Sequence, residues 1–126
     1  MDENQRILEC FRYVLPFIND LLVTDVSVSL IDREKFLLYK PGRKLDLKVK
    51  AGDPIKQGSA VWTALTEKRR IVTVVDKAVF GQPFIAVALP IYNSQKEIIG
   101  VASIQEAIDR QEELKAMANN LNDKLS

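Results

Sequence analysis

The stretch from Gly52 to Ile104 constrains the fold most, because it reads as a short helix followed by three strands with glycine and proline at the joints. In its longest strand, 84–92, apolar side chains fall on both faces of a period-two pattern. Two alanines, Ala86 and Ala88, lie between aromatic residues on one of these faces. We therefore expect a sheet that is covered on both faces, with space on one face for a closely packed helix or a ligand.

A helix is predicted at the start of the chain, over residues 2–22. Its apolar residues recur at helical spacing, and Asp2 is a suitable N-terminal cap. Pro16 removes one backbone donor, so it predicts a kink or a restart within this helix.

A hairpin is predicted next. Residues 24–31 alternate apolar and polar side chains, which is typical of a half-buried strand, and residues 35–39 form the second strand. Pro41 and Gly42 end the hairpin. Residues 43–56 show little periodicity and predict a loop or a short extended segment.

The inserted helix is predicted over residues 60–68, with Ser59 as its cap and basic residues 68–70 in its last turn. Strands at 71–75, 84–92 and 97–104 follow, the last two joined by a turn at 93–96. The expected fold is α+β, with a five-stranded antiparallel sheet and one helix inserted after the second strand.

A last helix is predicted over residues 105–126, because Ser103 and Glu106 have capping-box spacing. Leu114, Ala118, Leu121 and Leu125 form a short seam of the coiled-coil type. Two alternatives are open: the helix continues as a coiled coil, or it packs on its own sheet. The whole chain, 1–126, is expected to be one domain that divides into helix 1–22, sheet and pocket 24–104, and signalling helix 105–126.

Composition excludes several classes of protein. The chain has no histidine and one cysteine, Cys10, so no nucleophile and base are paired and a haem with an axial histidine is excluded. No acidic or cysteine cluster has the spacing of a zinc or calcium site. Apolar runs are far too short to span a bilayer, and the acidic N-terminus differs from a secretory signal. We expect a cytoplasmic protein that is not an enzyme and has no cofactor.

Charge is unevenly distributed, although the net charge is only +1. Between Arg33 and Lys77 there are 12 Lys and Arg against 5 Asp and Glu, so the middle of the chain is locally basic. Solvated loops and strand edges explain most of this excess. The alternatives are attraction of an anionic ligand or of nucleic acid, and we expect no nucleic-acid partner.

Three segments resemble the N-terminal sensor part of cytoplasmic methyl-accepting chemotaxis proteins. They are GDPIKQGSAVWTALTEKRR, VVDKAVFGQPFIAVALPIY and EIIGVASIQEAIDRQEELKAMANNL. The order of elements resembles the PAS/Cache-type sensor fold. The resemblance implies a small-molecule sensor whose last helix passes its signal to a coiled-coil output, acting in the full-length receptor on a histidine kinase and a coupling protein. The chain is then a fragment of a longer receptor or a free-standing sensor that works as a homodimer through its terminal helices.

The resemblance also implies a pocket between one sheet face and the helix and loops after the second strand. The candidate ligand-binding residues by position are Trp62, Arg70, Asp76, Lys77, Phe80, Phe84 and Tyr92. Asp76 suits a ligand amine, whereas Lys77 or Arg70 suits a carboxylate or phosphate, as in an anionic or amino-acid-like ligand. A lone tryptophan such as Trp62 is more often a core residue than a ligand contact. For Phe80 and Tyr92, packing between the sheet and its helix is favoured over a place in the pocket lining.

Two other functions remain open. The first is a ligand-free module that dimerises or docks a partner through its end helices. The second is the regulatory domain of a transcription factor, since similar folds occur there.

Overall fold

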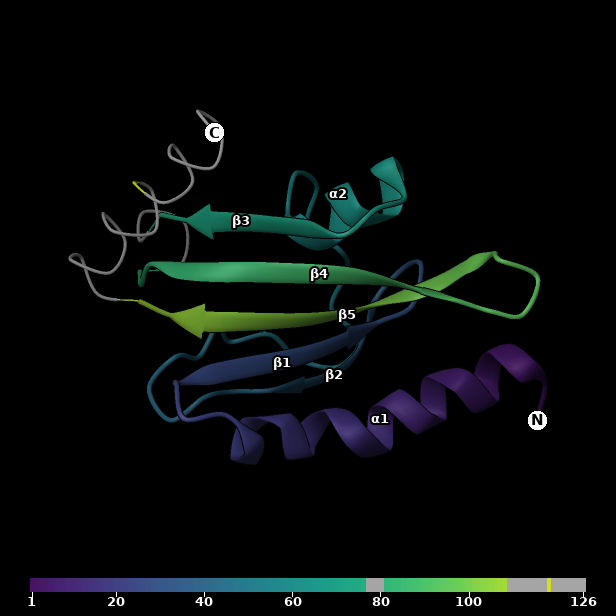
Figure 1. Cartoon of the computed structure of the whole chain (residues 1–126), viewed down its shortest axis with the longest axis horizontal. Helices are drawn as coiled ribbons and strands as arrows, with labels where there is room; N and C mark the ends of the chain where they lie inside the picture. The colour runs from purple at the N-terminus through teal and green to yellow at the C-terminus, as the bar shows by residue number, and fades with distance from the viewer. Residues whose placement is uncertain (77–80, 109–117, 119–126) are drawn as a thin grey trace.

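The computed structural model describes residues 1–76, 81–108 and 118 of the chain. The elements in chain order are α1 (Glu3–Leu21), β1 (Val26–Ile31), β2 (Phe36–Lys40), α2 (Ala60–Glu67), β3 (Ile71–Val75), β4 (Phe84–Tyr92) and β5 (Ile98–Ala107). All the strands pair antiparallel in one five-stranded sheet of order β2-β1-β5-β4-β3 (Figure 1). This confirms the predicted α+β fold with an N-terminal and an inserted helix, and the arrangement is consistent with a PAS-like fold.

Helix α1 begins where its capping residues predict. The Asp2 carboxylate accepts the backbone N–H of Gln5 at 2.8 Å, and the Gln5 side chain accepts the backbone N–H of Asp2 in return. Pro16 lies inside the helix, which nevertheless runs unbroken from residue 3 to residue 21. The Lys40 ammonium donates to the Pro16 carbonyl at 2.9 Å, which links the middle of α1 to the end of β2.

The two helices cover opposite faces of the sheet. Helix α1 packs on the face of β1 that carries Val28 and Leu30, and in Figure 1 it runs alongside β1 and β2. Helix α2 packs on the other face, where Ala64 meets Ile31 and Ala88. Each residue of β1 is buried, because both faces of this strand are covered. The predicted half-buried strand is therefore wrong for β1.

The outer face of the β3–β4 edge is less covered than the sequence predicts. Helix α1 packs mainly on β1, β2 and β5, and on β4 the apolar cluster that it forms includes Ile91. On this edge Val72 and Leu89 are 52% and 48% exposed. The expectation that both faces of the 84–92 strand are covered holds for Phe84, Ala86 and Ala88 but is wrong for Leu89.

Two predicted helix ends differ in the structure. Helix α2 stops at Glu67, and Lys68 takes the left-handed conformation with φ of 56°, so the basic residues 68–70 follow the helix instead of filling its last turn. Strand β5 continues to Ala107. The predicted capping box at Ser103 and Glu106 is therefore wrong, because both residues lie within the strand. The rest of the predicted last helix lies outside the described residues, apart from Ala118, which is helical.

Candidate functional site

A pocket of about 600 Å³ lies on the sheet face that α2 covers. Its walls come from the loop after β2, the first turn of α2 and strands β3 and β4. The apolar lining includes Phe36, Leu47, Val61, Phe84 and Ala86. This volume falls in the range of small-molecule sites in proteins. The pocket is therefore large enough for a metabolite-sized ligand.

A row of polar side chains forms the inner end of the pocket. Ser29, Ser103 and Gln105 line it, and at most 5% of each residue is exposed. The Gln105 amide donates to the Ser103 hydroxyl at 2.7 Å and accepts the Ser27 hydroxyl at 2.7 Å. The Ser29 hydroxyl donates to the same Gln105 oxygen at the longer distance of 3.4 Å. Buried polar groups are normally paired in this way, since an unpaired one is costly.

The sheet register brings this polar row together. Ser27 pairs directly with Gln105, and Ser29 pairs directly with Ser103, across strands β1 and β5. Side chains that oppose each other in this way point to the same face of the sheet. The Ser103 hydroxyl then donates to the carbonyl of Val87 on β4 at 3.0 Å. The row therefore crosses three adjacent strands beneath the pocket.

The outer wall is the loop between β2 and α2, and two contacts hold it on the sheet. Leu45 is fully buried against Phe84 and Ala86. The phenol oxygen of Tyr39 accepts the backbone N–H of Leu47 at 2.8 Å. Burial raises the pKa of the Tyr39 phenol, although the hydrogen bonds of this phenol with the Leu47 backbone and the Ser27 side chain oppose the shift. Leu45 and Leu47 therefore hold the loop in a fixed position as the outer wall of the pocket.

The base of this loop is fastened by Asp25, just before β1. Its carboxylate accepts the backbone N–H groups of Arg43, Lys44 and Leu45, the last two at 3.0 and 2.9 Å. Burial works against ionisation of Asp25, but the three backbone donors together hold its pKa below the usual value. The side chain thus acts as an anionic anchor for the loop.

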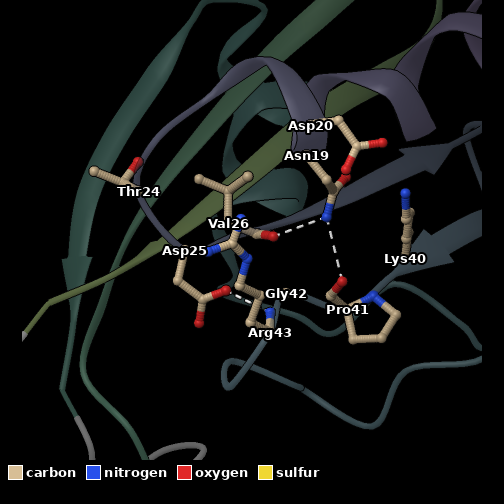
Figure 2. A pocket seen from close by; sticks show the side chains of 9 residues that line it. All are labelled: Asn19, Asp20, Thr24, Asp25, Val26, Lys40, Pro41, Gly42 and Arg43. Carbon is tan, nitrogen blue, oxygen red and sulfur yellow. Dashed lines mark hydrogen bonds between the residues drawn. The ribbon is translucent and has the colours of Figure 1, made fainter.

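A smaller hollow of about 150 Å³ surrounds this anchor (Figure 2). Asn19, at the end of α1, donates to the carbonyls of Val26 and Pro41 at 2.9 and 3.2 Å. Asp25 reaches across the same hollow to the N–H of Arg43. Because these side chains are engaged with the backbone, we interpret the hollow as a structural junction between α1, β1 and the loop.

Charged side chains lie at the mouth of the large pocket. Lys48, Lys56 and Asp76 are exposed, and Asp53 is half-buried. Asp53 accepts the backbone N–H of Lys50 at 2.9 Å, and the Lys48 ammonium lies 3.4 Å from the Asp46 carboxylate. Among the buried lining residues that the structure describes, none is ionisable. Charge is thus confined to the rim.

The structure brings only some of the predicted site residues to this pocket. Asp76 and Phe84 line it. Trp62 lies on α2 and is 36% exposed, outside the lining. Arg70 and Tyr92 are also exposed and away from it, and the Tyr92 hydroxyl donates to the Lys68 carbonyl at 3.3 Å. Lys77 and Phe80 lie outside the described residues.

The sequence reasoning missed Ser29, Ser103 and Gln105. The alternation over residues 24–31 predicts a half-buried strand with its polar side chains exposed, and the predicted last helix begins at Gln105. One local signal applies to Ser103 and Gln105 alone: they continue the period-two spacing of Val101, which places them on the same face of a strand that runs past residue 104. The capping-box spacing obscured this pattern.

Within residues 1–76 and 81–108, no three His, Cys, Asp or Glu side chains gather as metal ligands would. In the same part of the chain, neither α1 nor α2 combines the length and the apolarity that a helix needs to cross a membrane.

Comparison with known proteins gives one informative similarity. No family model matches the chain. Over 119 residues, which is 94% of this chain, the sequence is 31% identical to a protein of Bacillus subtilis (strain 168) named "Putative sensory transducer protein YfmS". The matched region spans 42% of the length of that protein.

Proposed function

We propose that this chain is the small-molecule-sensing part of a signal transducer, starting from its similarity to a protein named as a sensory transducer. The observation that carries the proposal is the pocket of about 600 Å³ with apolar walls and a buried polar row at its inner end. A cavity that combines apolar surface with a few converging polar groups is the usual form of a ligand site.

The position of Gln105 supports a route for the signal. Gln105 lies two residues before the end of β5, and the chain leaves the sheet after Ala107. The N–H of Ala107 donates to the carbonyl of Asp25 at 2.9 Å, so the end of β5 is tied to the residue that anchors the pocket loop. A ligand that moves the loop or Gln105 acts on the strand from which the C-terminal segment begins.

The finer parts of the proposal concern the whole receptor. We propose that the protein is cytoplasmic, that its C-terminal segment is a signalling helix leading to a coiled-coil output, and that this output controls a chemotaxis histidine kinase through a coupling protein. The domain itself is proposed to bind its ligand without catalysing a reaction.

Helix α1 favours a homodimer as part of this function. Its side away from the sheet carries a stripe of exposed apolar residues, Tyr13, Val14, Phe17 and Leu21. These positions lie on one side of a helix. The same stripe also favours a second candidate function, a docking module that works without a ligand.

Filling the pocket separates these two functions. We expect Ala86→Leu to fill the pocket from β4, while the control Leu89→Phe changes the exposed face of the same strand. Isotope-labelled protein is titrated with pooled metabolites, and backbone amide signals are followed by NMR. The sensor proposal predicts shifts of the Phe84 and Gln105 amide signals that the pocket-filling variant loses and the control keeps. Binding that survives equally in both variants, or no shift in any pool, contradicts it.

A further inference from the structure

The inner end of the pocket points to the chemistry of the ligand. We infer that this pocket selects an uncharged ligand that presents a hydrogen-bond acceptor beside a donor, such as a cyclic or aromatic amide, to Gln105 and Ser29. This inference rests on the proposed sensing function and names the class of ligand.

The first step is that the buried inner end of the pocket carries no charged side chain among the described residues. The buried polar lining residues in the described part of the chain, Ser29, Ser103 and Gln105, are all neutral. An ionic group buried among them has no counter-charge, and an unpaired buried charge is far more costly than a neutral polar group with hydrogen bonds. The inner part of the ligand is therefore uncharged, despite the locally basic sequence around the rim.

The second step is a count of hydrogen-bonding capacity at Gln105. Its amide oxygen accepts the Ser27 and Ser29 hydroxyls, which uses both lone pairs. Its amide nitrogen donates one hydrogen to Ser103 at 2.7 Å. The second amide hydrogen has no acceptor among residues 1–76 and 81–108, so Gln105 offers one donor to a ligand.

The third step is the same count at Ser29. Its hydroxyl hydrogen is directed to Gln105 at 3.4 Å, and its oxygen accepts no hydrogen bond from the part of the chain described. Ser29 therefore offers an acceptor next to the Gln105 donor, since both side chains line one pocket on neighbouring strands. An amide group, with C=O beside N–H, complements this pair.

The apolar residues of the pocket lining determine which chemistry suits the rest of the ligand. Phe36, Val61, Phe84 and Ala86 line the space above the polar row. They favour an apolar or aromatic body attached to the amide edge. A charged substituent, if the ligand carries one, is accommodated only toward the rim, near Asp53 or Lys56.

The test compares three probes of similar shape: benzamide, benzoate and toluene. Each is titrated into the full chain, and dissociation constants are read from the amide signals of pocket residues by NMR. Millimolar constants are expected for probes this small. Benzamide should bind about tenfold more tightly than benzoate or toluene, which corresponds to two modest hydrogen bonds, one with Gln105 and one with Ser29.

Variants assign the preference to the named side chains. Gln105→Leu should remove the advantage of benzamide over toluene, and Ser29→Ala should reduce it while making a smaller change to the core. Gln95→Leu, in the exposed β4–β5 turn, is the matched control and should keep it.

The outcomes distinguish a failure of the inferred ligand chemistry from a failure of the sensing function. Benzoate binding in the pocket as tightly as benzamide overturns the inference about ligand chemistry and leaves the sensing function standing. Equal binding of benzamide and toluene does the same. Pocket signals that stay unmoved by all three probes in the folded wild-type protein overturn the sensing function together with the inference.

Discussion

Ser27 and Gln105 are 78 residues apart in sequence, yet the Ser27 hydroxyl donates to the Gln105 amide oxygen at 2.7 Å within the sheet. Ser27 is fully buried and Gln105 nearly so. This pair connects the first and last strands by their side chains as well as by their backbones. It also fixes the orientation of the amide that faces the pocket.

Removing Gln105 should destabilise the domain. Gln105→Leu leaves the buried hydroxyls of Ser27 and Ser29 without their acceptor, so the free energy of unfolding should fall by about 1–3 kcal/mol. Urea denaturation measures this loss, with Gln95→Leu as the control. The double variant Ser27→Ala/Gln105→Leu should lose less than the sum of the single variants, because the orphaned hydroxyl is then gone. Strict additivity would contradict the coupling.

Asp25 should make stability depend on pH in the acid range. Its folded-state pKa lies below the unfolded value of about 3.9. The contribution of Asp25 to stability is therefore complete above that unfolded value, and it is lost as pH falls through the lower folded-state pKa. Asp25→Asn should lower stability at neutral pH and flatten the acid part of the profile. Parallel profiles of wild type and variant from pH 7 to strong acid would contradict the anchor role.

Lys68 offers a stabilising substitution. It ends α2 in the left-handed conformation, with φ of 56°, and its side chain is exposed. Lys68→Gly should raise the free energy of unfolding by about 0.5–1 kcal/mol, because glycine adopts this conformation without steric cost. Thermal unfolding measures the gain. Lys44→Gly, at a residue without a positive φ, is the control and should not stabilise.

Gly100 should tolerate no side chain. A Cβ built on Gly100 meets the carbonyl oxygen of Ile31 and lies 3.2 Å from a methyl carbon of Leu8. Gly100→Ala must therefore push β5 away from β1, and we expect a loss of about 1–3 kcal/mol, the usual cost of overpacking. Chemical denaturation should show this loss together with shifted amide signals of Ile31. An unchanged denaturation midpoint for Gly100→Ala would mean that the fold does not require the close approach of Gly100 to the Ile31 carbonyl.

The stripe on α1 predicts the oligomeric state. Phe17 is 52% exposed, and its ring centroid lies 5.6 Å from that of Tyr13 on the same side of the helix. Phe17→Glu should convert a dimer into a monomer, as measured by sedimentation velocity, without changing the fold. Arg12→Glu changes the charge of the same helix away from the stripe and should remain dimeric. A monomeric wild-type chain would refute the proposed dimer.

Local patterns predicted most of the fold. The cap at Asp2, the cap at Ser59 and the bounds of β3 and β4 follow from neighbouring residues, and the structure confirms them. The pairing of β1 with β5 brings together residues far apart in sequence. No local pattern therefore showed that Ser27 and Ser29 face a buried glutamine, or that α1 packs mainly on β1, β2 and β5.

The candidate site was predictable only in outline. The pocket lies on the sheet face that carries Phe84 and Ala86, and alternation within one strand defines this face. The polar inner end of the pocket was not predicted, because the capping-box spacing of Ser103 and Glu106 indicates the start of a helix. Whether Asp76 and Phe84 contact a ligand stays a prediction.

The strand order has a consequence for how this chain folds. Strand β5 lies between β1 and β4, so the β1–β2 and β3–β4 hairpins are joined into one sheet only through β5. During synthesis both hairpins emerge before it, and each is marginally stable alone. The sheet therefore closes late and through contacts of high sequence separation, which slow folding. Until that moment the two edges that will receive β5 stay open, and this is when the nascent chain is most exposed to aggregation.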